Sequence, residues 1–282
     1  MPSPLHQFIT NVSRQEDGVW RTTTQSDVFY PDEGHDTCHD VEDGSFWFSH
    51  RNRCIAAAIR HDPPDRDLPF ADVGGGNGFV ARMIKDLGFR VVLIEPGAAG
   101  IAHAKERGLD ELVQASIVDL DIAPGKLGAI GLFDVLEHIE NDADALHALN
   151  GMLAEGGKIY ATVPAHDWLW SSVDSEAGHF RRYTVGQIKA LFAECGFDTG
   201  FCSYYFWPLP LPMFLLRSLP ERLHLRKSPK PRDARVSSEH RRQGRLLRWL
   251  LSFEEGAFGR GRSMPCGASC ILVATKRSVP RA

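Results

Sequence analysis

A run of glycines follows a short apolar segment early in the chain. Residues Phe70 to Phe79 read Phe-Ala-Asp-Val-Gly-Gly-Gly-Asn-Gly-Phe, and a helical pattern begins directly after them. Gly74, Gly76 and Gly78 permit the positive φ angles of a tight turn and let the backbone approach a ligand closely. A dinucleotide-binding loop would have a third small residue at the position of Phe79. The segment therefore predicts a strand, a turn and a helix N-terminus that hold a cofactor of another kind.

A second set of side chains that can do chemistry lies between Val163 and Thr184. Histidine is a natural general base because its unperturbed pKa lies near neutral pH, so His166 and His179 are candidates, together with His138 upstream. Two tryptophans in the same loop offer an aromatic floor for a substrate. Alternatively, Asp174 pairs internally with Arg182 or His179, because loops without regular hydrogen bonds need side-chain anchors. The loop's candidates are His166, Trp168, Trp170, Asp174, His179, Arg181, Arg182 and Tyr183.

The segments around these residues alternate between β-prone and helical patterns. Such alternation predicts an α/β fold with a parallel sheet and helices on both of its faces. Thr184 and Gln187 have the capping-box spacing before the last of these helices. The predicted strands are Leu68–Val73, Arg90–Glu95, Glu111–Val118, Leu127–Asp134 and Lys158–Val163, and the predicted helices are Gly78–Leu87, Ala98–Gly108, Asp142–Leu153 and Val185–Cys195.

The N-terminal part adds two short features before this alternation. Residues Phe8–Val12 and Val19–Thr24 flank a polar turn and predict a hairpin. Ser45 is placed to cap a helix that continues to about residue 61. In that helix Trp47 and Arg51 are candidates to cover a cofactor; the alternative is ordinary packing with a surface charge.

The last part of the chain predicts an antiparallel edge and an insertion. Two β-prone runs, Thr199–Trp207 and Ala268–Arg277, are separated by residues that form no crossover helix. We therefore expect a Rossmann-like, seven-stranded, mostly parallel sheet with an antiparallel edge pair. The expected division is an N-terminal extension (1–44), a main domain (45–207 and 268–282, with a cap helix at 45–62) and an insertion (208–267).

The insertion is basic and partly amphipathic. A mobile lid or surface element is favoured over contact with a membrane surface, although an apolar run, basic residues and the segment Arg245–Phe253 are also features of interfacial segments. Prolines and Arg217 interrupt the apolar run Phe201–Leu219 too often for a spanning helix. The basic residues of the insertion are Arg222, Arg226, Lys227, Lys230, Arg232 and Arg235.

Composition narrows the function classes. The chain has 282 residues, 43% of them hydrophobic, and a net charge of −4, which is typical of a soluble globular protein and argues against a general nucleic-acid binder. Six cysteines without a Cys-x-x-Cys pair, and an N-terminus without a secretory signal, predict free thiols and a cytoplasmic location. We predict no metal site, since His35, Cys38 and His39 lie in one short acidic loop without a second cluster.

The motifs occur in an order that resembles class I S-adenosylmethionine-dependent methyltransferases, over roughly Ser45 to Lys276. The glycine loop resembles the first motif of that family, and the segment Leu132-Phe-Asp-Val-Leu-Glu-His-Ile139 resembles the part beside the sulfonium. The later Pro-Ala-His…Leu-Trp-Ser…Asp…Gly-His-x-Arg-Arg-Tyr-Thr loop is similar to one in a bacterial branch of the family. The resemblance implies a methyltransferase with S-adenosylmethionine as cofactor and S-adenosylhomocysteine as product.

The resemblance also implies roles for individual residues. Asp72 would lie near the amino group of the cofactor, Glu95 would accept hydrogen bonds from both ribose hydroxyls, and Asp119, as the end of the third strand, would accept from the adenine amino group. Arg51 would point to the cofactor carboxylate. The expected cofactor-binding residues are Trp47, Arg51, Asp72, Gly74, Gly76, Gly78, Glu95, Pro96, Asp119, Leu120, Phe133, Asp134 and His138.

The methyl acceptor is expected to be a small or medium, partly apolar molecule. Transfer is an in-line displacement, so the protein mainly positions and desolvates the acceptor, and an oxygen, nitrogen or sulfur nucleophile fits. The expected catalytic residues are His138, His166, His179 and Tyr183, and the expected acceptor-binding residues are Trp168, Trp170, Asp174, Arg182 and Tyr204. The alternatives are a protein that binds the cofactor without transferring a methyl group, a methyltransferase for a lipid-linked acceptor, and a nucleotide-dependent oxidoreductase, which Phe79 disfavours. The oligomeric state stays open.

Overall fold

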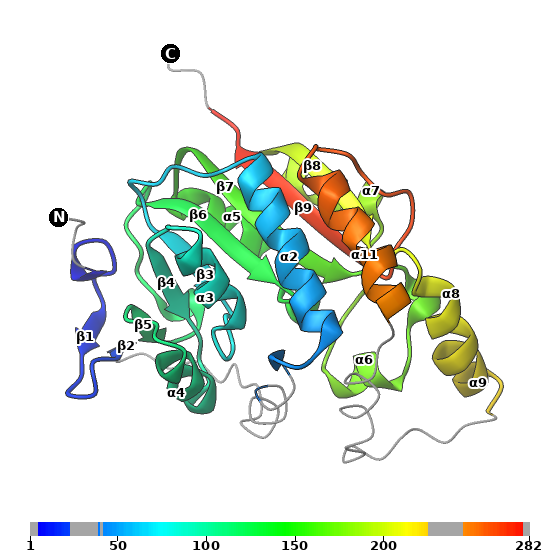
Figure 1. Ribbon diagram of the computed structural model, residues 1–282. Coiled ribbons are helices and arrows are strands. Elements are labelled where there is room, and N and C mark those ends of the chain that lie inside the picture. Colours follow the sequence, from blue (N-terminus) through cyan, green and yellow to red (C-terminus); the bar gives the residue numbers. More distant parts are fainter. Residues whose placement is uncertain (1–4, 23–38, 40–41, 225–244, 279–282) are drawn as a thin grey trace.

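One mixed β-sheet of nine strands organises the molecule (Figure 1). The computed structural model describes residues 5–22, 39, 42–224 and 245–278. Strands β5, β4, β3, β6 and β7 are parallel, whereas β9 is antiparallel to both β7 and β8. The spatial order is β1-β2-β5-β4-β3-β6-β7-β9-β8. The bounds are β1 Val12–Arg14, β2 Trp20–Thr22, β3 Phe70–Val73, β4 Val91–Ile94, β5 Leu112–Gln114, β6 Leu127–Phe133, β7 Leu153–Pro164, β8 Phe197–Tyr205 and β9 Ser269–Lys276.

The N-terminal hairpin explains why the sheet has nine strands rather than the seven predicted. β1 and β2 form an antiparallel pair as predicted, but its first strand is Val12–Arg14 rather than Phe8–Val12. β2 continues the sheet by pairing in parallel with β5. The segment before the hairpin also joins the core, because Ile9 is fully buried and bridges to Ile122. The α/β Rossmann-like fold and the antiparallel edge pair are confirmed. The division of the chain into an extension, a main domain and an insertion stays a prediction.

Helices cover both faces of the sheet and form two separate hydrophobic clusters. β4 shows why, since Val91 and Leu93 belong to one cluster and Val92 and Ile94 to the other, as the two-residue period of a strand requires. α2 and α11 lie side by side across one face (Figure 1). The α-helices are α2 Phe46–His61, α3 Phe79–Asp86, α4 Ala98–Glu106, α5 Asp142–Met152, α6 Ser172–Glu176, α7 Val185–Glu194, α8 Pro210–Met213, α9 Leu219–Arg222 and α11 Arg245–Phe258.

Short helical turns occupy several of the connections. The 3-10 turns are η1 Leu5–Gln7, η2 Ile117–Asp119, η3 Leu136–His138 and η4 Asp167–Leu169, and the π-helical turn η5 Phe214–Ser218 joins α8 to α9. The prediction that Asp119 closes the third strand is wrong, because β5 ends at Gln114 and the N–H of Asp119 donates to Ser116 within a turn. Most chemistry-bearing connections lie at the carboxyl ends of the parallel strands.

Two predicted helix caps are confirmed. The Ser45 hydroxyl accepts a hydrogen bond from the N–H of Trp47 at the start of α2. At α7 the Thr184 hydroxyl accepts from the N–H of Gln187, and the Gln187 side chain accepts from the N–H of Thr184 in return. These local bonds satisfy N–H groups that a helix start leaves without partners.

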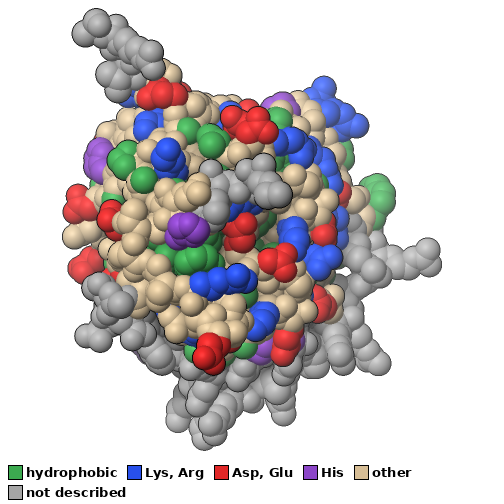
Figure 2. All heavy atoms as spheres, turned by 90° about the vertical axis from the view of Figure 1, so that its left-hand side faces the viewer, with side chains coloured by type: hydrophobic (Ala, Val, Ile, Leu, Met, Phe, Trp, Pro, Cys, Tyr) green, Lys and Arg blue, Asp and Glu red, His purple; other side chains and the backbone are tan. Residues whose placement is uncertain are grey.

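Charges on the described surface are intermixed on the face that carries the N-terminal side of the sheet. Figure 2 shows Lys and Arg side chains next to Asp and Glu side chains over this face. Ion pairs such as Arg82 with Asp86 and Lys85 with Asp110 have this character. Within the described ranges, no helix is both long and apolar enough to cross a membrane. His35, Cys38 and the basic residues from Arg226 to Arg235 lie outside the described residues.

Candidate functional site

The loop between β3 and α3 follows a path that only glycine permits. Gly74, Gly76 and Gly78 have φ values of 65°, 50° and 74°. A Cβ at Gly74 would lie 2.8 Å from the Val135 side chain, and a Cβ at Gly78 would lie 2.7 Å from Leu109. The loop therefore lies directly against the segment after β6 and exposes backbone rather than side chains to a ligand.

Asp72, the next-to-last residue of β3, lies below this loop as a buried carboxyl group. Its side chain is 1% exposed, and its Oδ2 atom has no hydrogen-bond partner among the described residues. Burial raises the pKa of Asp72 to about 7; the Arg51 guanidinium opposes this shift and the Glu95 carboxylate adds to it. An unsatisfied buried carboxylate of this kind fits a cationic group of a ligand.

Glu95 connects the end of β4 to the glycine loop. Its carboxylate accepts the N–H of Gly76 at 2.9 Å and the N–H of Gly97 at 2.8 Å. These two bonds tie the carboxylate to the backbone of the glycine loop and to the start of α4. Pro96 follows directly, Asp119 is half-buried in η2, and Leu120 and Phe133 are each 7% exposed.

Arg51 of α2 reaches across to the end of β6. Its guanidinium donates to Asp134 Oδ2, while the Thr162 hydroxyl donates to Asp134 Oδ1 at 2.9 Å. Trp47, one turn earlier in α2, stacks on Phe206 with ring centroids 3.9 Å apart. The N-terminal half of α2 thus lies against the carboxyl ends of β6 and β8, as expected for a helix that covers the site.

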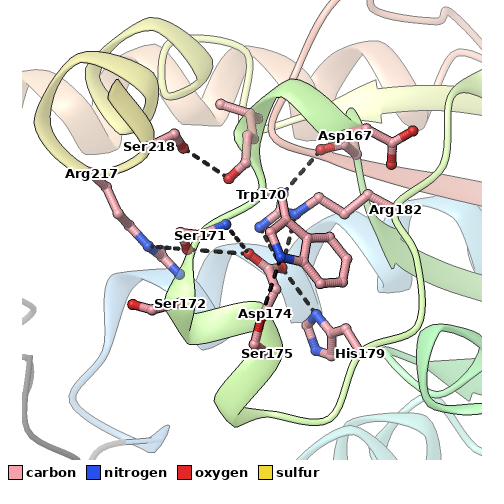
Figure 3. Close-up of polar contacts among 12 residues, drawn as sticks. Asp167, Trp170, Ser171, Ser172, Asp174, Ser175, His179, Arg182, Arg217 and Ser218 are labelled. Carbon is pink, nitrogen blue, oxygen red and sulfur yellow. Dashed lines mark hydrogen bonds and ion pairs between the residues drawn. The ribbon is translucent and has the colours of Figure 1, made fainter. Parts of the chain in front are cut away.

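The loop from Ala165 to Tyr183 is anchored internally, as the alternative interpretation predicted (Figure 3). The Asp174 carboxylate accepts from Arg182 Nε at 2.8 Å, from the N–H of Ser171 at 2.9 Å and from His179 Nδ1 at 3.0 Å. Burial alone would raise the pKa of Asp174, but these donors lower it to about 2. Asp174 and Arg182 are 1% and 6% exposed, so the geometry supports an anchoring role for both.

Tyr183 is also held away from solvent. Its hydroxyl donates to Asp142 Oδ2 at 2.8 Å, and its side chain is 4% exposed. Burial and the Asp142 carboxylate raise its pKa well above the ordinary value. This hydroxyl therefore keeps its proton at neutral pH and stabilises the contact between the loop and α5.

An aromatic stack forms the accessible side of the same loop. The His166 ring stacks on Tyr204 of β8 at 4.8 Å and lies 5.5 Å from Trp168. Trp168 is 41% exposed, whereas the Trp170 indole N–H donates to Ser175 at 3.3 Å. Burial and Arg182 lower the pKa of His166, so its ring is neutral at pH 7 and able to accept a proton.

His138 and His179 lie together on the other side of the loop. Their ring centroids are 4.8 Å apart in an edge-to-face arrangement. Burial, with a smaller contribution from His179, lowers the pKa of His138 to about 4. His138 is therefore a neutral imidazole at pH 7 and a weak base.

Comparison with known proteins decides the family. A family model described as "Methyltransferase domain" matches residues 48–199, more than half of the chain. The chain belongs to this methyltransferase family. The probable S-adenosylmethionine-dependent methyltransferase Rv3030 of Mycobacterium tuberculosis (strain ATCC 25618 / H37Rv) is 21% identical over 207 residues, which cover 71% of this chain and 74% of the relative. The ubiquinone biosynthesis O-methyltransferase of Azotobacter vinelandii is 28% identical over 95 residues, which cover 32% of this chain and 41% of the relative.

Solved structures share the fold of this methyltransferase. Haemonchus contortus phosphoethanolamine N-methyltransferase 2, in complex with S-adenosyl-L-methionine, superposes with a TM-score of 0.56 at 18% identity over 89% of this chain. This chain covers 59% of that structure's chain. The [4+2]-cyclase SpnF superposes with a TM-score of 0.51 at 18% identity, and the match covers 81% of each chain. The fold is therefore shared by proteins whose names describe different reactions.

S-adenosylmethionine is the cofactor of this methyltransferase family, and the residues present fit it. The glycine turn provides backbone where a Cβ would collide with neighbours. The unsatisfied oxygen of Asp72 fits the cofactor's ammonium group, and the Glu95 carboxylate lies at the next strand end, bonded to the glycine loop. Which residues contact the cofactor stays a prediction.

The sequence analysis missed one connection between α2, α11 and the end of β8. Glu254 of α11 is fully buried, lies 2.6 Å from His50 Nε2, and accepts the N–H groups of Phe206 and Trp207. Phe206 has a positive φ of 60°, which these bonds stabilise. A glutamate within the apolar stripe of the α11 segment was the available signal, but its partners are 47 or more residues away along the chain.

Proposed function

We propose that this enzyme transfers a methyl group to a small or medium, partly apolar acceptor that binds between the aromatic loop, α2 and the end of β8. The carrying observation is the stack of His166 on Tyr204 beside the exposed ring of Trp168. It combines an apolar surface with one titratable ring, and its strand, β8, is followed by Phe206, on which Trp47 of the cap helix stacks. An oxygen, nitrogen or sulfur nucleophile fits this environment.

The proposed division of labour follows from the contacts. When bound, S-adenosylmethionine supplies a methyl group that is already activated as a sulfonium. Asp72, Glu95 and the glycine loop hold the cofactor, and Arg51 with Asp134 closes the site from the cap helix. Trp168 and Tyr204 orient the acceptor and exclude water.

For an acceptor that is protonated at neutral pH, His166 is the general base. Its ring is neutral at pH 7 and borders the open side of the loop. We assign this role to His166 rather than to Tyr183, whose hydroxyl is bonded to Asp142, or to His138, whose low pKa makes it a weak base.

Formation of S-adenosylhomocysteine tests the proposal. A panel of alcohols, phenols, amines and thiols is added to the full chain, and product is corrected for spontaneous hydrolysis. We expect acceptor-dependent product, and we expect His166→Gln to lower kcat by about 10²-fold for hydroxyl acceptors while cofactor affinity is kept. Retained cofactor binding without product from any acceptor would favour the alternative of a binding protein.

A lipid-linked acceptor at an anionic membrane surface is a second candidate, favoured by one surface observation. Leu211, Leu215 and Leu216 on α8 and η5 are 63%, 48% and 69% exposed, and Trp249 and Phe253 on α11 are each 69% exposed. In sequence, residues 225–248 contain nine Lys or Arg and two Asp or Glu. Exposed apolar side chains next to a basic segment fit anionic lipid headgroups and acyl chains.

Vesicle sedimentation distinguishes the two candidates. The lipid-linked candidate predicts binding to vesicles of phosphatidylcholine with 30% phosphatidylglycerol, weaker binding to phosphatidylcholine alone, and a loss in the double variant Trp249→Ser, Phe253→Ser. Phe180→Ser is a matched control, since Phe180 is 52% exposed on a different loop. Equal sedimentation of wild type and double variant would leave the soluble acceptor as the conclusion.

A further inference from the structure

Three potential metal ligands converge at the carboxyl end of β6. Glu137 and His138 belong to η3, and His179 follows α6 in the anchored loop. One ligand atom of each residue lies within 4.8 Å of the others. The two segments are also joined by their backbones, because the N–H of Phe180 donates to the carbonyl of Glu137 at 2.7 Å. The spacing of the three side chains is therefore fixed by the fold.

Glu137 has a buried carboxyl group with one oxygen that lacks a hydrogen-bond partner among the described residues. Its side chain is 1% exposed, and the oxygen without a partner is Oε2. The nearby cations are already engaged, Arg51 with Asp134 and Arg182 with Asp174. A bound cation would offset the cost of keeping this carboxylate in the interior.

The two histidines are oriented before any ligand arrives. His179 Nδ1 lies 3.0 Å from Asp174 Oδ1 (Figure 3), and this hydrogen bond to a carboxylate places a proton on Nδ1 and leaves Nε2 as the atom that can bind a ligand. Histidines that ligate metals commonly have such a carboxylate partner, which fixes their tautomer and orientation. Hydrogen bonds to the backbone at Ala177 and Gly178 fix the ring of His138.

We propose that Glu137, His138 and His179 bind a divalent transition-metal cation of the Zn²⁺ or Co²⁺ type. Two imidazoles and one carboxylate match the preferences of these ions better than those of Mg²⁺ or Ca²⁺, which favour oxygen ligands. Three protein ligands leave coordination positions for water or for an oxygen of a small molecule. Its ligand Glu137 comes two residues after Val135, whose side chain lies against Gly74 of the glycine loop. If the proposed methyl transfer is correct, an oxygen atom of the methyl acceptor would occupy an open coordination position of this cation.

A second cluster of His50, Cys54 and Glu254 is a poorer cation site. Both carboxylate oxygens of Glu254 already accept backbone N–H groups, from Phe206 and Trp207. Burial raises the pKa of the Cys54 thiol well above its ordinary value, and the Glu254 carboxylate raises it further. This cluster therefore serves as a control for the proposal.

Titration of the metal-free full chain with Co²⁺, followed by visible absorption, tests the site, with Zn²⁺ calorimetry in parallel. We expect one equivalent to bind to the wild type, and affinity to fall more than about tenfold in Glu137→Gln and in His179→Gln. His147→Gln, an exposed histidine of α5, and Cys54→Ser should bind as the wild type does. Glu137→Gln keeps the side-chain shape and replaces the buried carboxyl group with a neutral amide, so its thermal unfolding midpoint should not fall.

Three results would overturn the proposal: no stoichiometric binding to the wild type, unchanged binding in both ligand variants, or loss of binding in Cys54→Ser. Calorimetry with S-adenosylmethionine on the metal-free protein separates this inference from the proposed function. If the cofactor binds and the metal does not, only the metal site fails. If the metal binds and no acceptor is methylated, only the proposed function fails.

Discussion

The cofactor side and the acceptor side of this enzyme are built in different ways. The glycine loop, Asp72 and Glu95 lie at the ends of neighbouring parallel strands, and their geometry comes from backbone conformation within 25 residues of sequence. The loop from Ala165 to Tyr183 has little regular structure and depends on the contacts of Asp174, a buried side chain. The cofactor side is therefore fixed by glycines that are close in sequence, whereas the acceptor side depends on a buried ion pair.

The largest expected effect is a loss of stability on the acceptor side. Asp174→Asn leaves the buried Arg182 guanidinium without its charged partner, so we expect the free energy of unfolding to fall by about 3–5 kcal/mol. The folded pKa of Asp174, about 2, lies below its ordinary 3.8, so its contribution is present above pH 4 and is lost as the pH falls from 4 to 2. Urea unfolding at pH 7 and pH 3 measures both.

The matched control for that variant is Asp17→Asn. Asp17 also pairs with an arginine, Arg21, but at an exposed site where ion pairs contribute little. Equal destabilisation by both substitutions would contradict the anchoring role of Asp174.

The second prediction concerns cofactor affinity on the cofactor side. Gly74→Ala forces a side chain into a positive φ and against Val135, so the loop must move. We expect affinity for S-adenosylmethionine to fall more than about 100-fold, or about 2.7 kcal/mol. Isothermal titration calorimetry measures it. Gly151→Ala in α5, where a Cβ meets open space, should bind the cofactor as the wild type does.

Asp72 sharpens the comparison because stability and binding should change in opposite directions. Its folded pKa of about 7 lies above the ordinary 3.8, so its ionisation lowers stability as the pH rises from 4 to 7. We expect Asp72→Asn to stabilise the cofactor-free protein at pH 8 by roughly 2 kcal/mol and to weaken cofactor binding about tenfold. A variant that is less stable at pH 8 than the wild type would show that the carboxylate is not destabilising.

The smallest expected effect is a loss of stability at the N-terminus of α7, outside the cofactor side and the acceptor side. Thr184→Ala removes one cap bond of α7, and we expect a loss of about 1 kcal/mol in stability with unchanged cofactor affinity. Chemical denaturation and calorimetry together check this. A large change in cofactor affinity would mean that α7 transmits its position to the glycine loop.

The same difference explains what the sequence allowed us to predict. The alternation of strands and helices, the glycine turn and the caps of α2 and α7 follow from local patterns, and they appear as expected. The N-terminal strands were predicted as a hairpin but not as part of the main sheet, because pairing of β2 with β5 depends on residues about 90 positions apart.

Long-range side-chain contacts were harder to predict. Asp174 was named both as an acceptor contact and as an anchor, and its burial and its hydrogen bonds to Arg182 and His179 favour the anchor. The cluster of Glu137, His138 and His179 escaped a search for metal ligands, because His179 comes from a separate loop. The spacing of residues along the chain does not predict contacts between distant side chains unless the fold is known.

Cofactor calorimetry on two variants tests the central claim, which is that the two sides are built independently. The account predicts that Gly74→Ala loses S-adenosylmethionine binding while remaining folded, and that Asp174→Asn at a temperature where it remains folded binds the cofactor within about threefold of the wild type. Loss of cofactor binding in Asp174→Asn, or its retention in Gly74→Ala, would contradict the account.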